Sequence, residues 1–383
     1  MPNAKEDKIL EKLKQQREKD FSFSKGNILG SMCTQPYPIA KKAYMMFLET
    51  NLGDPLLFPG SKEIEKKYID FLKKLLNAPR NSEGLIGSGG TESNLSAIWL
   101  AKKINPKRRE LIVPQSAHFS FEKIASIMDI KLVNIPLDKD YRMDANVVRK
   151  KINNKTIAVV GIAGSTELGT IDPIPELGRI CYDENVFLHV DAAFGGYIIP
   201  FLKKLEYNVP DFDFKVKGVS SITIDAHKMG CSAIPLGSLV IRDKKWMGKI
   251  SVDTPYISSV KQPGILATRS AAPVAAAYAV AEYLGFEGYK EIMETCMKNT
   301  MYVKKRIEDL GLNLITNPTM NVLAIKLKNP CKTVDLLTKQ GWKVNKMSRL
   351  SSIRIVVMPH ITKKVIDSFI PVFKKTCRKT GDL

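Results

Sequence analysis

The stretch VFLHVDAAFGG (186–196) is a short, mainly apolar run that ends in Asp191 and continues into small residues. Such a run predicts a β-strand buried on both faces. Similar runs recur on both sides of it, and helical patterns at 92–103, 120–128 and 174–184 separate several of them. The other strand candidates are LIVP (111–114), KLVNIP (131–136), TIAVVGIAG (156–164), SSITID (220–225) and GSLVIR (237–242). Buried strands alternating with helices predict an α/β domain with a mainly parallel sheet covered on both faces.

The segments outside this region extend the domain at both ends. Residues 4–19 carry Ile9, Leu10 and Leu13 among charges, which predicts an amphipathic helix that packs as an arm. Further helices are predicted over 62–76 and about 270–310. The tail reads as strand (320–327), helix (332–340), strand (352–358) and helix (362–375). We predict an N-terminal segment (1–50), a large domain (51–270) and a small C-terminal α/β domain (271–383).

The composition is that of a globular enzyme. The chain has 383 residues, of which 44% are hydrophobic and 26% charged, and this excludes a disordered chain or a fibre. Six cysteines form no CxxC pair and no Cys/His cluster, so we predict no metal site. The N-terminal residues lack the apolar core of a signal peptide, and no apolar run is long enough to span a bilayer. We predict a cytoplasmic protein without membrane contact.

The charge balance raises the question of a nucleic-acid partner. Lys and Arg number 59 against 39 Asp and Glu, a formal net charge of +20. Clustered basic residues neutralise phosphates, whereas dispersed lysines are typical of a solvated, thermophile-like surface. Here the lysines are spread along the chain beside acidic residues, as in KEIEKKYIDFLKK (62–74). We therefore predict a solvated surface and no nucleic-acid partner.

A glycine-rich loop, GSGGTESN (87–94), precedes a predicted helix. Backbone N–H groups of such a loop and the helix N-terminus favour a phosphate. No Gly-Lys-Ser/Thr follows, and Glu92 stands where GxGxxG needs its third glycine. Gly89 and Gly90 could alternatively serve only a tight turn.

Side chains that could bind a ligand or take part in catalysis follow several of the predicted strands. Asp191 ends one strand, His227 and Lys228 follow another in SITIDAHKMG (221–230), and His118 follows a third. Each has an ordinary structural explanation, as a helix cap, a surface lysine or a core histidine. Because ligands of open α/β sheets bind beyond the carboxyl ends of the strands, we expect these residues to meet. A phosphate cup, an imidazole, an aspartate and a lysine together match the needs of pyridoxal 5′-phosphate.

At these residues the chain resembles a known family. GSGGTES, the His118 segment, GSTELGTID (164–172), DAAFGG and HKMG occur in the order of the group II pyridoxal-phosphate-dependent amino-acid decarboxylases, enzymes of fold type I (aspartate-aminotransferase-like, PLP-dependent transferase-like). ILGSMCTQPYP (28–38), NLGDPLLFPG (51–60) and RIVVMPH (354–360) look closer still to the archaeal L-tyrosine/L-aspartate decarboxylases of methanogens. The resemblance spans nearly the whole chain.

The resemblance implies roles for residues at matching positions. Lys228 would hold the cofactor covalently, Asp191 would pair with the ring nitrogen, and His118 would stack on the ring. The remaining cofactor contacts would come from Ala193 on the other face, Thr166 near the phenolic oxygen, and Gly89, Gly90, Thr91 and His227 at the phosphate. Thr268 would reach the cofactor of a partner subunit, although Ala267 replaces the family's glycine.

The expected reaction is decarboxylation of an L-amino acid within a homodimer. L-Tyrosine would give tyramine for methanofuran synthesis, and L-aspartate would give β-alanine for coenzyme A synthesis. Tyr37 would suit an aromatic substrate, whereas Arg354 would suit a carboxylate or form a strand-edge salt bridge. Lys228, His227 and Tyr256 are candidate proton donors.

Two other classes stay open at this point. A tRNA-dependent enzyme of the same fold, which converts phosphoseryl-tRNA to cysteinyl-tRNA, would use the positive charge, but Cys33 stands alone in the first part of the chain. A non-catalytic binding protein of this fold would need neither Lys228 nor Asp191.

Overall fold

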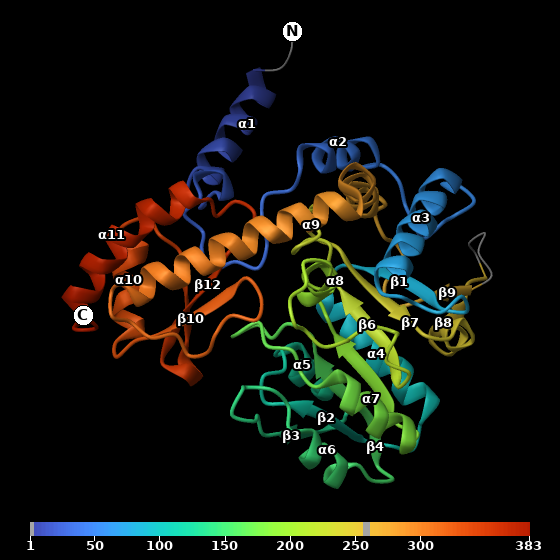
Figure 1. The fold of residues 1–383 in the computed structure, drawn as a ribbon. Coiled ribbons are helices and arrows are strands. Elements are labelled where there is room, and N and C mark those ends of the chain that lie inside the picture. Colours follow the sequence, from blue (N-terminus) through green and yellow to red (C-terminus); the bar gives the residue numbers. More distant parts are fainter. Residues whose placement is uncertain (1–3, 256–260) are drawn as a thin grey trace.

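The computed structural model describes residues 4–255 and 261–383. Its centre is a seven-stranded sheet in the order β1-β7-β6-β5-β4-β2-β3 (Figure 1). The strands β2 to β6 run parallel, and β7 is antiparallel to both β6 and β1. Their bounds are β1 Glu83–Gly87, β2 Glu110–Pro114, β3 Lys131–Ile135, β4 Thr156–Ile162, β5 Phe187–Asp191, β6 Val219–Ile224 and β7 Gly237–Ile241.

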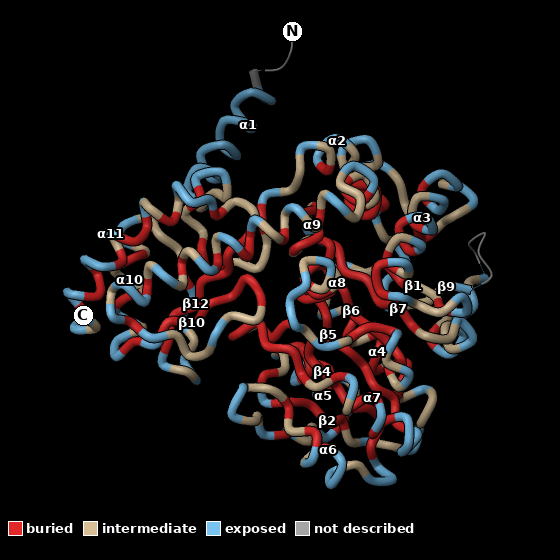
Figure 2. Tube along the Cα trace, in the orientation of Figure 1, coloured by how far each residue is buried: buried red, intermediate tan, exposed pale blue. Residues whose placement is uncertain are grey.

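Successive side chains of a strand point to opposite faces of the sheet, so the hydrophobic core is divided between the two faces. Val159 of β4 packs in one hydrophobic cluster, whereas Ala158 and Val160 pack in another. Helices α4 (Gly90–Ile104) and α5 (Ser120–Met128) supply the second cluster. The first is covered by α3 (Pro59–Leu75), α6 (Ala145–Lys151), α7 (Ile174–Asp183) and α8 (Ile199–Lys204). Burial on both faces explains the near-continuous apolar strands (Figure 2).

A smaller three-stranded antiparallel sheet follows, ordered β10-β12-β11. Its elements are β10 Val322–Lys326, α10 Pro330–Lys339, β11 Asn345–Met347, β12 Ser352–Val356 and α11 Lys363–Thr380. The long helix α9 (Ala272–Glu308) connects the two regions and bends at Gly285, where φ is 57°. Val274 at its start packs in the large core, whereas Val303 and Ile307 near its end pack with the small sheet.

The N-terminal segment reaches across both regions. Helix α1 (Ala4–Arg17) projects from the molecule (Figure 1), and residues 5–17 are all exposed. After it, Leu29 accepts a hydrogen bond from Val356 of β12, and α2 (Pro38–Met46) lies against α9. The short elements are β8 Ser251–Asp253, β9 Lys261–Pro263 and the 3₁₀ turns Phe23–Lys25, Gly195–Tyr197, Lys244–Ile250 and Ser348–Leu350.

The predicted α/β fold with a mainly parallel sheet is confirmed, with some elements missed. Strand β1 escaped prediction because two of its five residues are glycine, and α2, α6 and α8 are too short for a clear helical period. The expectation that α1 packs as an arm is not met within this chain, since its side chains are exposed. The domain boundaries stay a prediction. No helix in residues 4–255 and 261–383 is long and apolar enough to span a membrane.

Candidate active site

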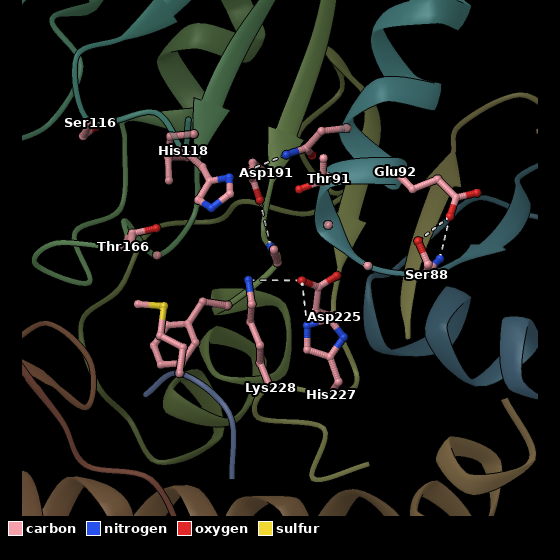
Figure 3. Close-up of a pocket in the computed structure, with 18 residues that line it drawn as sticks. Ser88, Thr91, Glu92, Ser116, His118, Thr166, Asp191, Asp225, His227 and Lys228 are labelled. Atoms are coloured by element: carbon pink, nitrogen blue, oxygen red, sulfur yellow. Dashed lines mark hydrogen bonds and ion pairs between the residues drawn. The ribbon is translucent and has the colours of Figure 1, made fainter. Parts of the chain in front are cut away.

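A cavity of about 310 Å³ opens beyond the carboxyl ends of β4, β5 and β6, beside the start of α4 (Figure 3). Nine of the predicted site residues line it: Gly89, Gly90, Thr91, His118, Thr166, Asp191, Ala193, His227 and Lys228. They come from segments more than a hundred residues apart. Parallel strands bring their carboxyl ends to one edge, and this topology assembles the site.

Lys228 is paired with an aspartate that the sequence analysis did not single out. Its Nζ lies 3.1 Å from Oδ2 of Asp225, and its side chain is 21% exposed. Burial lowers the pKa of Lys228, but the charges of Asp225 and Asp191 raise it, and the pKa ends above its ordinary value. The lysine is therefore a cation in this structure. His227 accepts a hydrogen bond at Nδ1 from the backbone N–H of Leu236 (3.1 Å), and burial lowers its pKa.

Asp191 is held by two hydrogen-bond donors. The side-chain amide of Asn94 donates to Oδ2 (2.9 Å), and the backbone N–H of Ala193 donates to Oδ1 (3.1 Å). Oδ1 of Asn94 faces Nε2 of His189 at 3.0 Å, and Nδ1 of His189 faces Oγ of Ser221 at 2.8 Å. Burial lowers the pKa of His189 to about 4, so its ring is neutral. Donors on both oxygens fix the orientation of the Asp191 carboxyl group.

The glycine-rich loop forms a cup at the N-terminus of α4. Gly89 has φ of 151°, which favours glycine, and a Cβ there would lie 3.2 Å from the ring of His227. A Cβ on Gly90 would lie 2.9 Å from Oδ2 of Asp225. Glu92 accepts hydrogen bonds from the backbone N–H and hydroxyl of Ser88, both at 2.7 Å, and fixes the loop. The open backbone and the positive end of the helix dipole suit a phosphate.

His118 lies across the cavity from Lys228 (Figure 3). Its Nδ1 accepts the backbone N–H of Ser120 at 3.2 Å, and its ring contacts Phe119 with centroids 4.0 Å apart. Burial lowers the pKa of His118, which favours a neutral ring able to stack on a flat group.

The other three predicted residues do not line this cavity. The guanidinium of Arg354 is buried and donates to the backbone carbonyls of Thr166 and, at 2.7 Å, of Gly30. Burial lowers the pKa of Arg354 to about 10. We expected Arg354 to bind a substrate carboxylate or to form a salt bridge. Its partners here are backbone carbonyl groups, so these contacts are neither. The substrate role stays a prediction.

Tyr37 and Thr268 lie to the side of the cavity. The Tyr37 ring packs near Tyr283, with centroids 6.2 Å apart, and burial raises its pKa. Thr268 is exposed and lines a neighbouring cavity together with Ser88, which also borders the cavity of Lys228. Tyr256, a candidate proton donor, lies outside the described residues.

Sequence reasoning missed Asp225, Asn94 and His189. Asp225 ends a strand in SITIDAHKMG just as Asp191 ends VFLHVD, so the same signal could have identified it. Asn94 and His189 carried no comparable signal, since their role depends on contacts across the sheet. Within the described residues, no group of three or more His, Cys, Asp or Glu side chains could hold a metal ion.

This geometry agrees with what the sequence matches. Residues 54–328 match the family described as "Pyridoxal-dependent decarboxylase conserved domain". The chain belongs to this family. The lysine, the aspartate and the glycine cup therefore lie in the cavity of a pyridoxal-phosphate-dependent amino-acid decarboxylase, and the predicted enzyme class and cofactor are confirmed.

Curated relatives are similar over nearly the whole chain. A "Probable L-tyrosine/L-aspartate decarboxylase" of Methanothermobacter thermautotrophicus is 44% identical over 91% of this chain and 96% of its own. A "Probable L-aspartate decarboxylase" of Archaeoglobus fulgidus is 42% identical over 97% of this chain and 100% of its own. An "L-aspartate/L-glutamate decarboxylase" of Pyrococcus horikoshii is 43% identical over 96% of this chain and 97% of its own.

Solved structures share the fold. A sphingosine-1-phosphate lyase of Burkholderia pseudomallei superposes with a TM-score of 0.90 at 26% identity, over 98% of this chain and 91% of that chain. A glutamate decarboxylase of Lactobacillus brevis has a TM-score of 0.87 at 23% identity, over 99% of this chain and 94% of that chain. Fold type I is thus confirmed.

The residues present fit the cofactor. The cup leaves backbone N–H groups and space for a phosphate, a lysine stands beside it, and a hydrogen-bonded aspartate lies across the cavity. One buried oxygen, Oδ1 of Asp225, has no hydrogen-bond partner among the described residues. These are features of a cavity built around a bound polar group.

Proposed function

We propose that this decarboxylase removes the α-carboxyl group of L-tyrosine and of L-aspartate, giving tyramine and β-alanine. The observation that carries the chemistry is the meeting of Lys228, Asp191 and the glycine cup in one cavity. Support for the two substrates comes from the names of relatives that are 41–45% identical. From the resemblance to methanogen enzymes we extend the proposal to methanofuran and coenzyme A synthesis. The cytoplasmic location stays a prediction.

In this proposal each residue has a role. Pyridoxal phosphate, when bound, supplies an aldehyde that forms a linkage with an amine and a ring that withdraws electrons. Lys228 would hold it, Gly89, Gly90, Thr91 and His227 would bind its phosphate, and Asp191 would face its ring nitrogen. His118 and Ala193 would cover the two faces of the ring, with Thr166 at its edge. Asp191 would accept a hydrogen bond from that nitrogen.

A homodimer is part of the proposal. Exposed apolar side chains, at least 44% accessible, occur in the chain segments around Tyr44, Leu52 and Leu266, which line the same cavity as Thr268: Met45, Met46, Leu56, Leu57, Ile265 and Leu266. Clusters of this kind favour a protein partner. Ser88 borders both cavities, so a second copy docked there would lie next to the cup.

The test is an assay of carbon dioxide release from L-tyrosine, L-aspartate and L-glutamate by protein loaded with pyridoxal phosphate. We expect a visible absorbance band and release from the first two substrates, both lost in Lys228→Ala. Lys217→Ala, which alters a lysine whose Nζ lies over the Tyr182 ring, is the control. A band without release from any amino acid would contradict the proposed substrates, and absence of the band would contradict the role of Lys228.

A further inference from the structure

Asp225 is the most deeply buried charged group of the cavity. Its side chain is 1% exposed, with Oδ2 at 3.1 Å from Lys228 Nζ and at 3.6 Å from His227 Nε2 (Figure 3). The α-carbons of Gly90 and Gly237 approach it so closely that a Cβ on either would lie within 2.9 Å of a carboxylate oxygen. The cup is therefore built closely around this carboxylate.

A carboxylate in such a place needs a cation. Removing an ion from water is unfavourable unless it is paired and hydrogen-bonded. Oδ1 of Asp225 has no hydrogen-bond partner among the described residues, so Oδ2 carries its stabilising contact, and that contact is Lys228. The same reasoning applies to the lysine, whose ammonium has no second ion-pair partner in residues 4–255 and 261–383.

Lys228 pairs with Asp225 through its ammonium group, and while a substrate amine occupies the cofactor the released lysine needs such a partner. We propose that Asp225 is a catalytic residue, the counter-ion that receives Lys228 each time this lysine is released from the cofactor. The inference rests on the linkage between Lys228 and the cofactor proposed above.

The exchange balances in atoms and protons. To form the linkage, the Lys228 ammonium gives one proton to solvent, the neutral amine attacks the aldehyde carbon, and the carbonyl oxygen leaves as water. When a substrate amine takes over that carbon, Lys228 leaves as a neutral amine, takes up a proton from solvent and pairs with the Asp225 carboxylate. The resulting ion pair stabilises the released lysine and so favours the exchange.

Other titratable groups also face this pair. His227 comes from the same loop, Asp191 from β5, His118 from the segment before α5, and Cys33 from the N-terminal segment. Tyr68 of α3 interacts electrostatically with Asp225, and burial raises the pKa of Tyr68 well above its ordinary value. Among the described residues, Asp225 is the acidic group that forms an ion pair with Lys228 Nζ.

The first test measures how fast Lys228 of the cofactor-free protein condenses with pyridoxal, which lacks the phosphate, as a function of pH. In the unaltered protein we expect a midpoint at or above the ordinary lysine value of 10.5, because the ion pair opposes loss of the proton. Asp225→Asn should move this midpoint down by at least about one pH unit. A midpoint well below 10.5 in the unaltered protein, or no shift in the variant, would overturn the proposal.

The second test measures the exchange itself. Tyramine or β-alanine is titrated into the loaded protein, and the change in the visible band gives the dissociation constant of the amine that replaces Lys228. We expect this constant to rise at least about ten-fold in Asp225→Asn and in Asp225→Ser. Asp213→Asn is the matched control, since Asp213 is 5% exposed and bound by Asn77 away from this cavity.

The outcomes separate the two proposals. If the unaltered protein forms no visible band, the linkage to Lys228 fails and this inference fails with it. If the band forms but both variants keep the midpoint and the dissociation constants of the unaltered protein, Asp225 is not the counter-ion, and the proposed function stands.

Discussion

The side-chain amide of Asn94 lies 2.9 Å from Oδ2 of Asp191, and this contact orients a chain of buried polar groups. Because the amide nitrogen donates to Asp191, its oxygen is free to accept, and Nε2 of His189 must be the donor at 3.0 Å. Nδ1 of His189 then accepts from Ser221. The aspartate that would face the cofactor ring is thus fixed by helix α4 and two neighbouring strands.

Replacing Asn94 should slow the reaction although Lys228, Asp191 and Asp225 all stay in the cavity. Asn94→Leu removes a hydrogen bond to a charged acceptor, which is worth about 1.5–3 kcal/mol, and we expect carbon dioxide release to fall by about ten- to a hundred-fold. Steady-state kinetics of the loaded protein would measure this. Ser96→Ala on the same helix, at a buried hydroxyl outside the cavity, is the control. An unchanged rate in Asn94→Leu would show that Ala193 alone holds Asp191.

The stability of the protein should fall in acid because His189 is buried and neutral. Its pKa is about 4 in the folded chain against 6.5 as the ordinary value, so the unfolded chain binds more protons between these values. The contribution is fully present above pH 6.5 and is lost as the pH falls towards 4, by about 3 kcal/mol. Urea unfolding from pH 7 to 4 would measure it. His189→Gln, which can still donate to Asn94, should flatten this slope, and an equal slope in both proteins would contradict the assignment.

A methyl group added at Gly90 should weaken binding of the cofactor in the glycine cup. In Gly90→Ala the new Cβ would lie 2.9 Å from Asp225 and 3.2 Å from Cβ of Ala193, so backbone or carboxylate must shift. We expect the dissociation constant for pyridoxal phosphate to rise at least about ten-fold, or about 1.4 kcal/mol. Equilibrium titration followed by absorbance measures it. Gly60→Ala, where nothing lies within 4 Å of the new Cβ, should leave the affinity unchanged.

A substitution of Arg354 can distinguish a role in binding substrate from a role in holding two backbone segments together. Its guanidinium joins the carbonyls of Thr166 and Gly30, a fork that lysine cannot reproduce. We expect Arg354→Lys to lower the melting temperature and to change KM for tyrosine and aspartate alike. If Arg354 binds a substrate carboxylate through the side chain of aspartate, KM for aspartate alone should rise. Parallel assays of the two substrates decide between these outcomes.

The proposed homodimer predicts a position-dependent effect of surface charge. Leu57 and Ile127 are 71% and 70% exposed, but Leu57 follows Leu52, which lines the same cavity as Thr268, whereas Ile127 lies on α5. Burial of a leucine contributes about 1.5–3 kcal/mol, so Leu57→Asp should weaken association by at least about ten-fold. Ile127→Asp should not. Light scattering across a dilution series would measure the association of each protein. A monomer at all concentrations of the unaltered protein would contradict the dimer.

The sequence alone was sufficient for the class of fold and for most of the cavity. Runs such as TIAVVGIAG and VFLHVD are apolar at successive positions because both faces of β4 and β5 are covered, and this property is local enough to be read from composition. Strand-end residues such as Asp191 and Lys228 could be grouped because parallel strands share a carboxyl edge.

Contacts across the sheet needed the tertiary structure. Whether Arg354 faces a substrate or two carbonyls depends on where the segment around Gly30 crosses β12, and no local pattern encodes that crossing. The pairing of Lys228 with Asp225 and the chain from Ser221 to Asp191 depend in the same way on side-chain directions fixed by packing. Sequence periodicity determined which residues reach the edge of the sheet, whereas close packing in three dimensions decided which of them touch.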